Sequence, residues 1–408
     1  MVMTRQIAVC FLLGALASPA AAQQARFDDV VRNLRNPDPK VRLSAVRLLR
    51  ESKYPEAAGP VAALVNDPVD LVQLEAIAAE RSFFLVNDIP GKKRVALLVE
   101  VRNPAPAETA FGLGPLAVWT HPVPPELVQA LLEAVNDKNQ KVRVEAIYTL
   151  GTIARPPLAA APAADLIKAL DHYDPVIRAA AARVVGRLDV KSAGDALITS
   201  VNDSTSMVRY AAMRALGEIR EARAVPALTE QLTFYNTGEG GAAALEALAR
   251  IASPSSVPVF TARLTDKDPR FRTAAAEGLG RAGDTSEVAA LQMGAGNDTS
   301  AEARAAMAFA LQKLGQHYVP RLVEFMTAPK TAGQVAAYLI ELGPSIVPEL
   351  TPHLQDPSPA IRANVATVIG ALGGAGAEAA LAPLAADRDH DVAQAATRAL
   401  QRLKTQAP

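Results

Sequence analysis

The sequence is poor in the residue types that most often carry chemistry. Its 408 residues include one cysteine and one tryptophan, and aromatic residues make up only 4% of the chain. Cys10 lies in the N-terminal apolar run, so a chain that loses this run has neither a thiol nucleophile nor a disulfide. No two histidines are three or four residues apart, as a zinc site on one helix face would need; they are His121, His172, His317, His353 and His390. We therefore predict no catalytic, cofactor-binding or metal-binding residues.

The chain also lacks a charge excess and long apolar runs. Lys and Arg total 42 and so do Asp and Glu, with no basic stripe of the kind that follows a nucleic-acid backbone. Half of the residues are hydrophobic, which is too many for a disordered chain. These features predict a folded protein that binds no nucleic acid and has no membrane span once the N-terminal segment is removed.

Residues 1–22 have the pattern of an export signal. Arg5 is followed by an apolar run from Ile7 to Ala17 and by the small residues Ala20 to Ala22, where cleavage is expected. The run of 11 residues is too short to span a bilayer core of about 30 Å as a helix. We predict a periplasmic or secreted protein; the alternative is an uncleaved N-terminal anchor.

The segment Asn202 to Leu232 is typical of a helical hairpin. Its first half places apolar residues with the i, i+3, i+4, i+7 spacing of an amphipathic helix. Its second half begins at Val225-Pro226, and proline is tolerated there because the first helical turn does not use its missing N–H. One hairpin of this size cannot bury both of its apolar faces and needs neighbours of the same kind.

The sequence contains such neighbouring hairpins. With Val208 as a marker, equivalent positions recur, and seven of the ten intervals between them are 31 or 32 residues. This regularity predicts a solenoid of repeated hairpins. The markers are Val41, Val72, Val142, Ile177, Val208, Gly240, Phe271, Ala303, Gln334, Ile361 and Val392.

Three features recur in register with these markers. Helix-capping residues stand three positions before ten of the eleven markers. Aspartates five positions before and arginines one position after the marker predict rows of ion pairs between repeats; the alternative is a charged groove for a ligand. Glycines nine positions after it predict a close approach between the two helices of a hairpin. These glycines are Gly151, Gly186, Gly217, Gly280, Gly343 and Gly370.

The repeat motifs carry a family resemblance. Asp268 to Gly280, Asp174 to Gly186 and Ser358 to Gly370 resemble HEAT repeats, and in particular the short bacterial subtype called phycobilisome-lyase HEAT-like repeats. The resemblance implies an all-α, right-handed α-solenoid of about eleven hairpins over residues 23–408, with the second helices on the concave face. It also raises two enzymatic alternatives, a bilin lyase and a deoxyhypusine hydroxylase. The hydroxylase binds iron through His-Glu pairs, and this sequence contains no His-Glu dipeptide.

The interval between Val72 and Val142 departs from the pattern. Within it, residues 83–125 form an irregular insertion that holds the only tryptophan and several prolines. An insertion in a repeat array often projects from its binding face. We predict that Phe111, Trp119 and His121 contact a partner, because aromatic side chains dominate the binding energy of interfaces. The alternative is an irregular repeat whose aromatic rings fill its own core.

These observations predict a non-catalytic exported scaffold. A large repeat surface without a catalytic constellation is typical of proteins that bind a protein or a peptide. An enzyme or accessory factor of the lyase or hydroxylase kind is the alternative.

Overall fold

The computed structural model describes residues 27–87, 93–96, 99–102, 106–119, 121–159 and 162–406. The predicted export signal, residues 1–22, lies outside this part of the chain. Residues 27–33 are helical, as the amphipathic pattern around them indicates, and Phe27 packs edge-on against Tyr54 with ring centroids 5.4 Å apart. No helix in the described ranges combines the length and the apolar character needed to cross a membrane.

The predicted all-α solenoid is confirmed, and the described part of the chain contains eleven first helices. Each lies at one of the eleven predicted repeats and packs on the first helices before and after it. They are α2 (Pro39–Ser52), α4 (Asp70–Phe84), α7 (Gln140–Ile153), α9 (Pro175–Arg187), α11 (Ser206–Glu218), α13 (Gly238–Ile251), α15 (Pro269–Ala282), α17 (Ala301–Lys313), α19 (Pro329–Leu342), α21 (Pro359–Leu372) and α23 (His390–Gln406).

The second helices are shorter, and several begin or end with a 3-10 turn. Their brevity follows from the short apolar stretches between the polar turns of each repeat. They are α3 (Ala58–Ala62), α6 (Pro125–Ala134), α8 (Ala164–Ala169), α10 (Gly194–Ser200), α12 (Val225–Tyr235), α14 (Val257–Arg263), α16 (Val288–Asn297), α18 (Val319–Glu324), α20 (Val347–Leu350) and α22 (Ala377–Leu381).

Capping explains where many first helices begin. The side chains of Asp38, Asn139 and Asp174 each accept a hydrogen bond from the backbone N–H two residues later. Thr205 and Ser358 occupy the same position with extended backbone, but their side chains make no capping bond. The prediction is thus correct for the position of the cap and only partly correct for its hydrogen bond.

The predicted Asp–Arg rows are present and structural. Arg272 forms a bidentate pair with Asp298 of the next turn, with N–O distances of 2.7 Å, and also donates to the carbonyl oxygens of Asp266 and Lys267. Asp298 accepts a third hydrogen bond from the N–H of Ser300. Each pair therefore joins two turns and one helix start. The same bidentate contact is made by Arg42 with Asp67, Arg178 with Asp203, and Arg362 with Asp387.

The recurrent glycines permit close packing, but between different helices from those predicted. A Cβ atom on Gly280 would lie 2.5 Å from the Cα of Ala310, and one on Gly217 would lie 2.8 Å from the Cα of Ala247. Both neighbours are on the first helix of the next repeat, so the predicted contact within one hairpin is wrong. First helices approach each other closely because glycine and alanine face each other there.

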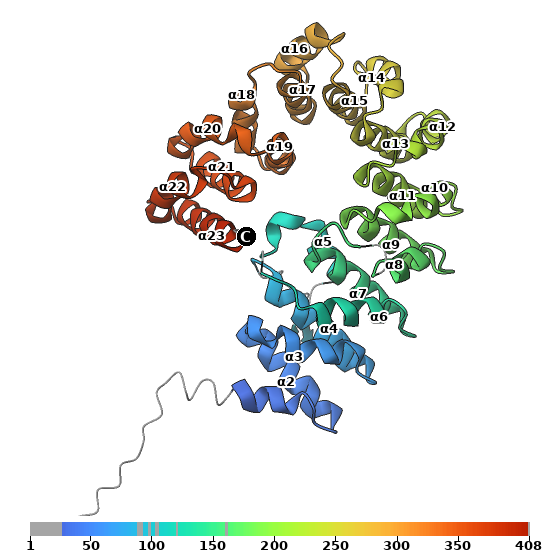
Figure 1. The fold of residues 1–408 in the computed structure, drawn as a ribbon, viewed down its shortest axis with the longest axis vertical. Coiled ribbons are helices and arrows are strands. Elements are labelled where there is room, and N and C mark those ends of the chain that lie inside the picture. Colours follow the sequence, from blue (N-terminus) through green and yellow to red (C-terminus); the bar gives the residue numbers. More distant parts are fainter. Residues whose placement is uncertain are drawn as a thin grey trace, which may run out of the picture.

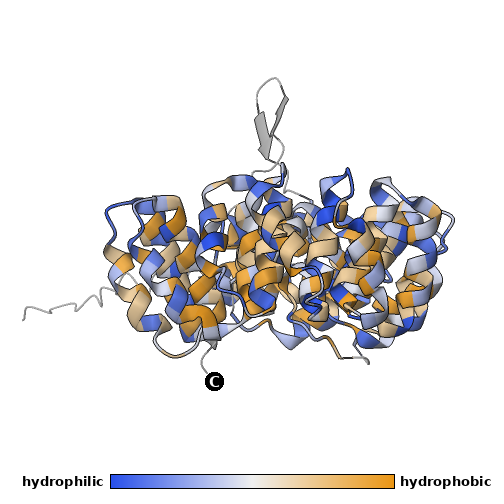
Figure 2. Cartoon of the chain, turned by 90° about the horizontal axis from the view of Figure 1, so that it is seen from above, coloured by the Kyte–Doolittle hydropathy of each residue, from blue (hydrophilic) through white to orange (hydrophobic). Residues whose placement is uncertain are grey.

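This close approach sets the curvature of the array. First helices line the inner side and second helices lie outside, which corrects the prediction that second helices would form the concave face (Figure 1). Tight spacing of the first helices shortens that side of the solenoid. Seen from above, apolar residues run through the helices of the whole array, whereas many edge loops are polar (Figure 2).

One repeat was predicted in the wrong register. Helix α19 begins at Pro329 after the cap position Ala328, so its marker is the fully buried Thr331 rather than Gln334. Gly343 consequently does not pack against a neighbour. It follows the last residue of α19 with a φ of +85°, a left-handed conformation that glycine adopts without strain.

The irregular interval contains one hairpin and an added segment. Helix α4 ends at Phe84, α6 begins at Pro125, and α4 packs directly on α7. Between them lie the antiparallel strands β1 (Lys93–Ala96) and β2 (Val99–Arg102), the helix α5 (Ala107–Gly112) and a 3-10 turn at Pro115–Ala117. The backbone N–H of Ala107 donates to the Glu145 carboxylate of α7, which anchors the start of α5.

The array curls until its last helix reaches this added segment. Arg402 of α23 donates hydrogen bonds to the carbonyl oxygens of Leu116 and Val118, and Arg398 donates to Asn87. In Figure 1 the red C-terminal helix accordingly lies beside the cyan segment that contains α5. Helices α2 and α3 continue the array beyond this point of closure.

Candidate functional site

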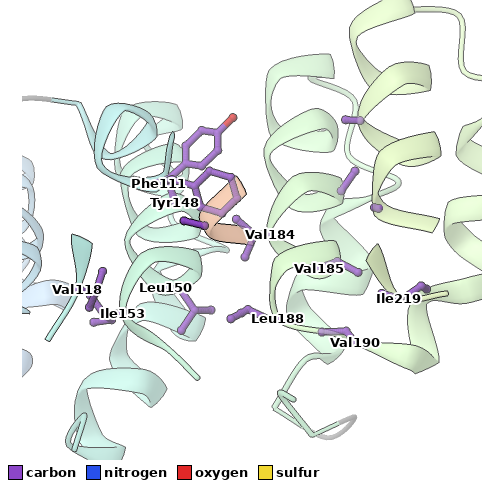
Figure 3. Packing of buried hydrophobic residues seen from close by; sticks show 14 of the residues in the cluster. Phe111, Val118, Tyr148, Leu150, Ile153, Val184, Val185, Leu188, Val190 and Ile219 are labelled. Atoms are coloured by element: carbon purple, nitrogen blue, oxygen red, sulfur yellow. The ribbon is translucent and has the colours of Figure 1, made fainter. Parts of the chain in front are cut away.

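Phe111, one of the predicted partner contacts, lies in the core. Its side chain is 5% exposed, and its ring lies 5.4 Å from that of Tyr148 (Figure 3). The guanidinium of Arg187 covers the ring at 4.1 Å from the centroid. The prediction that Phe111 stands on the surface for a partner is therefore wrong, because the ring fills the space between α5, α7 and α9. This placement agrees with the alternative of an irregular segment whose aromatic rings fill its own core.

Trp119 and His121 lie together and are half-buried. Their ring centroids are 6.0 Å apart, and the Trp119 backbone N–H donates to the carbonyl oxygen of Phe84. The backbone bond holds the end of the added segment against the end of α4. A partner contact by these two side chains stays a prediction.

The concave face carries a row of charged residues that recurs with the repeat. Ten positions after five successive markers stand Arg187, Glu218, Arg250, Arg281 and Lys313, one on each first helix from α9 to α17. Charges at this position recur because it lies beyond the apolar stripe of each first helix. The row thus runs along the inner side of the solenoid.

Several charges on this face are neutralised within the chain. Arg281 pairs with Glu277 and, at 2.9 Å, with both carboxylate oxygens of Glu341. Burial opposes the charge of Arg281, but the hydrogen bond to Glu341 and the charge of Glu277 raise the pKa of Arg281 above its ordinary value. Glu277 also accepts a hydrogen bond from the Tyr338 hydroxyl. These groups form a closed network with little capacity left for a ligand.

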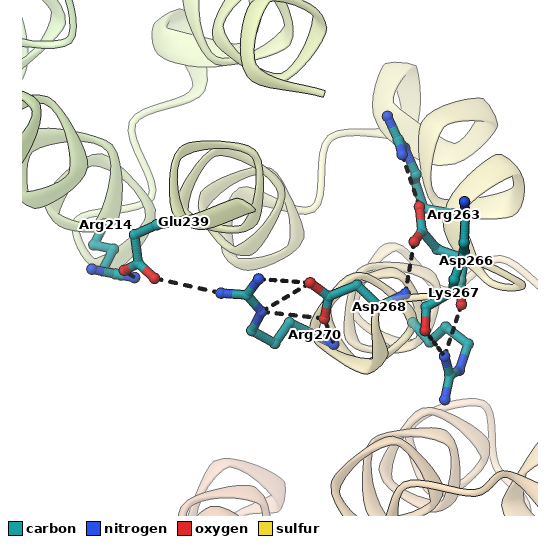
Figure 4. A network of polar contacts seen from close by, with 8 residues as sticks. Arg214, Glu239, Arg263, Asp266, Lys267, Asp268 and Arg270 are labelled. Atoms are coloured by element: carbon teal, nitrogen blue, oxygen red, sulfur yellow. Dashed lines mark hydrogen bonds and ion pairs between the residues drawn. The ribbon is translucent and has the colours of Figure 1, made fainter. Parts of the chain in front are cut away.

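A second network lies at the rim of the same face. Arg214 pairs with Glu239, while Arg270 pairs with Asp268 and reaches Glu239 at 3.5 Å (Figure 4). Arg214 also pairs with Glu246. The charges of α11, α13 and α15 are thereby linked side by side. Both arginines of this network have carboxylate partners within the chain.

Arg250 lies between these networks and differs from both. Its side chain is exposed, and it makes no hydrogen bond or ion pair with any residue that the structure describes. Glu218, on the neighbouring helix, likewise has no such bond within the described ranges. Burial raises the pKa of Glu218, although the charges of Arg250 and Arg187 act in the opposite direction.

Two pockets adjoin Arg250. The first has a volume of about 470 Å³ and is bordered by α13, α15 and α17 together with Gln334 of α19. The second, of about 510 Å³, is lined by Arg187, Glu218, Asp189 and three prolines. One of these prolines, Pro115, belongs to the added segment, which therefore contributes to the rim of the second pocket.

The concave face around Arg250 is suited to binding an anionic group of a ligand. A guanidinium without an internal partner presents planar donors that match a carboxylate or a phosphate. In the described part of the chain, no group of three or more His, Cys, Asp or Glu residues is arranged to hold a metal ion. The sequence analysis did not predict Arg250 or Glu218 as site residues. The signal was available, because charges ten positions after the marker recur in five consecutive repeats.

Comparisons with known proteins identify the repeats. Residues 163–233, 239–312 and 319–406 match the family described as HEAT repeats, and residues 127–155 match the HEAT repeat family. No curated protein matches the sequence.

Two solved structures resemble this chain at low identity and with low TM-scores. The crystal structure of an engineered protein is 19% identical, with a TM-score of 0.44, over 93% of this chain and 98% of that one. A chain from the structure describing how Kap95p binding induces the switch loops of RanGDP to adopt the GTP-bound conformation is 12% identical, with a TM-score of 0.37. That match covers 95% of this chain and 57% of the other. On the strength of the family matches, which span more than half of its length, this chain belongs to the HEAT-repeat family.

Proposed function

We propose that the chain is an exported, non-catalytic scaffold that binds a protein or peptide segment along its concave face. The observation that carries the proposal is the position of Arg250, which has no partner in the described chain and adjoins two pockets. On this face Arg214, Arg270 and Arg281 are paired with carboxylates. An exposed guanidinium that makes no bond to a described residue is a strong site for an external ligand. The finer resemblance, to the phycobilisome-lyase HEAT-like subtype, is part of this proposal and rests on the repeat motifs.

Export and partner binding can be tested together. N-terminal sequencing of the protein from its native host should begin at Gln23, and the protein should be recovered from the periplasm or the medium. Affinity purification of this mature form should then recover a stable protein or peptide partner. A chain that begins at Met1 and stays in the cytoplasm would overturn the assignment to export.

The enzymatic alternatives are distinguished by two measurements on the same sample. Metal analysis would detect iron of the hydroxylase kind, and an absorbance scan would detect a bound bilin. The proposal expects neither signal. Bound iron or a tetrapyrrole band, together with measurable turnover and no partner, would favour an enzyme.

A further inference from the structure

We propose that Arg250 receives a carboxylate of the bound peptide, and that the two adjoining pockets hold the residues on either side of it. This inference rests on the proposed function and adds the chemistry of the ligand. The group in question is a single carboxylate, supplied either by an acidic side chain or by a C-terminus.

The donors of Arg250 are available to a ligand, unlike those of the other arginines on this face. Arg214, Arg270 and Arg281 line the same face, and each has carboxylate partners within the chain. Arg187 donates to the carbonyl oxygen of Phe111 and covers its ring. Arg250 is the exposed arginine of this group whose donors make no bond to a described residue. A ligand anion can therefore bind it without breaking an internal ion pair.

The carboxyl groups around Arg250 limit the negative charge that a ligand can carry there. Glu246, Glu277 and Glu302 border the first pocket with Arg250, and Asp189 and Glu218 border the second. A phosphate or a polyanion would place two or more negative charges among these carboxyl groups. Like charges repel, whereas one carboxylate matches the one guanidinium that makes no bond to a described residue. The surroundings thus favour a monovalent anion.

The two pockets differ in the uncharged residues that line them. Thr273, Ser300 and Gln334 give the first pocket polar side chains that can hydrogen-bond to a peptide. Pro115, Pro156 and Pro157 give the second pocket apolar surface beside the charged side chains of Arg187, Asp189 and Glu218. A peptide lying across Arg250 would accordingly carry its carboxylate between a polar residue and an apolar residue.

Three labelled nonapeptides test the carboxylate. The first has a central glutamate between a serine and a leucine in a Gly-Ser background, with an amidated C-terminus. The second has glutamine in place of glutamate. The third keeps the glutamine but has leucine as its last residue, with a free C-terminal carboxylate. Fluorescence anisotropy with the mature protein should give measurable binding of the first or the third peptide, at least about 10-fold tighter than the second, as a charge-assisted hydrogen bond implies. Preference for the first identifies an acidic side chain as the ligand, and preference for the third identifies a C-terminus.

Protein variants locate the binding. Arg250→Ala should weaken the favoured peptide about 10-fold, and Arg250→Lys should restore part of this loss because it keeps the charge without the bidentate donors. Arg321→Ala is the matched control, since Arg321 is exposed on the second helix α18, where it pairs with Glu324 and lies over the ring of Phe325. The melting curves of the Arg250 variants should match that of the native protein, because Arg250 makes no bond to a described residue.

Two results would overturn the inference. One is equal binding of all three peptides, or binding of none of them with a Kd below about 1 mM. The other is an Arg250→Ala protein that binds the favoured peptide as the native protein does. If the native partner is still captured in either case, the scaffold function stands and only the carboxylate receptor is excluded.

Discussion

Arg402, near the C-terminus, donates a hydrogen bond of 3.0 Å to the carbonyl oxygen of Val118, which is 284 residues earlier in the sequence. A second bond of 3.3 Å joins the same guanidinium to the carbonyl oxygen of Leu116. An open solenoid has contacts only between neighbouring repeats, so these bonds convert the array into a closed curve. Burial lowers the pKa of Arg402, which indicates that the contact removes the guanidinium from water.

The closure predicts that Arg402→Met opens the array. Methionine keeps the apolar stem but removes both hydrogen bonds, so the ends should separate and the radius of gyration should rise. Small-angle X-ray scattering would measure this change. Lys404→Ala, on the exposed side of the same helix, should leave the scattering curve unchanged. Identical curves for Arg402→Met and the native protein would show that closure does not depend on this residue.

The Asp–Arg row predicts a loss of stability when one of its members is removed. The Arg272 and Asp298 side chains are only 11% and 8% exposed, and Arg272→Ala leaves Asp298 partly buried without its partner. We expect a loss of about 2 kcal/mol in the free energy of unfolding, measured by urea denaturation. Arg270→Ala is the control from the same helix. It removes an ion pair in which the arginine side chain is 47% exposed, so the loss should be below about 1 kcal/mol.

The same pair predicts how stability depends on pH. The hydrogen bond from Arg272 lowers the pKa of Asp298 below its ordinary value of 3.8. A carboxyl group with a lowered pKa in the folded state contributes stability above its unfolded pKa and loses it as the pH falls through the folded pKa. Arg272→Ala should therefore reduce the loss of stability in acid below about pH 4. An unchanged acid transition would contradict this assignment.

Two glycines predict opposite effects of alanine. Gly280→Ala places a Cβ against the backbone of Ala310 and should cost about 1–3 kcal/mol through overpacking. Gly333 lies within α19 with no atom near its missing Cβ, so Gly333→Ala should stabilise by about 0.5–1 kcal/mol. Thermal melting of the two variants would show both signs. Two destabilised variants would mean that helix spacing is not set by these contacts.

A buried carboxyl predicts a stabilising substitution. Glu80 is fully buried, and neither of its carboxyl oxygens has a hydrogen-bond partner among the residues that the structure describes. It stands where most other first helices have an aliphatic core residue. Glu80→Leu should raise the free energy of unfolding at pH 7 by about 1–3 kcal/mol. Glu80→Gln, which keeps the polar atoms, is the comparison.

The pH dependence of stability provides a second check on the burial of Glu80. Burial, with a smaller effect from Glu126, raises the pKa of Glu80 well above the ordinary value of 4.5. A carboxyl group whose pKa is raised by folding lowers stability as the pH rises above the unfolded pKa, because the folded protein retains the proton. The native protein should lose stability above about pH 4.5, and Glu80→Leu should lack this part of the pH dependence. Equal pH profiles would place Glu80 in contact with solvent.

Periodicity predicted the fold well because each first helix repeats the same physical requirements. The cap positions, the Asp–Arg rows and the buried markers all follow from contacts that every repeat makes with its neighbours. The error at Gln334 arose where Ala328 replaces a capping side chain and Thr331 replaces an aliphatic marker. Local signals fail when the residues that carry them are substituted.

The candidate site was harder to predict. The insertion attracted attention because Phe111 and Trp119 break the pattern, yet Phe111 fills a space that only the packed array creates. Arg250 belongs to a regular row, and it is the arginine of this row that makes no bond to a described residue. Sequence shows which charges recur, but the pairing of Arg214 or Arg281 depends on side chains from several helices.

Site-specific photo-crosslinking in the native host is the most direct test of the concave face as the binding surface. A photoreactive residue replacing Thr273, which lines the first pocket beside Arg250, should form an adduct with a protein or peptide partner. The same residue replacing Met293, which is 67% exposed on the outer helix α16, should form none. Introducing Arg250→Glu into the Thr273 variant should abolish the adduct. An adduct from position 273 that persists with Arg250→Glu would exclude Arg250 as the receptor of the ligand carboxylate. An adduct from position 293 with none from position 273 would contradict binding along the concave face.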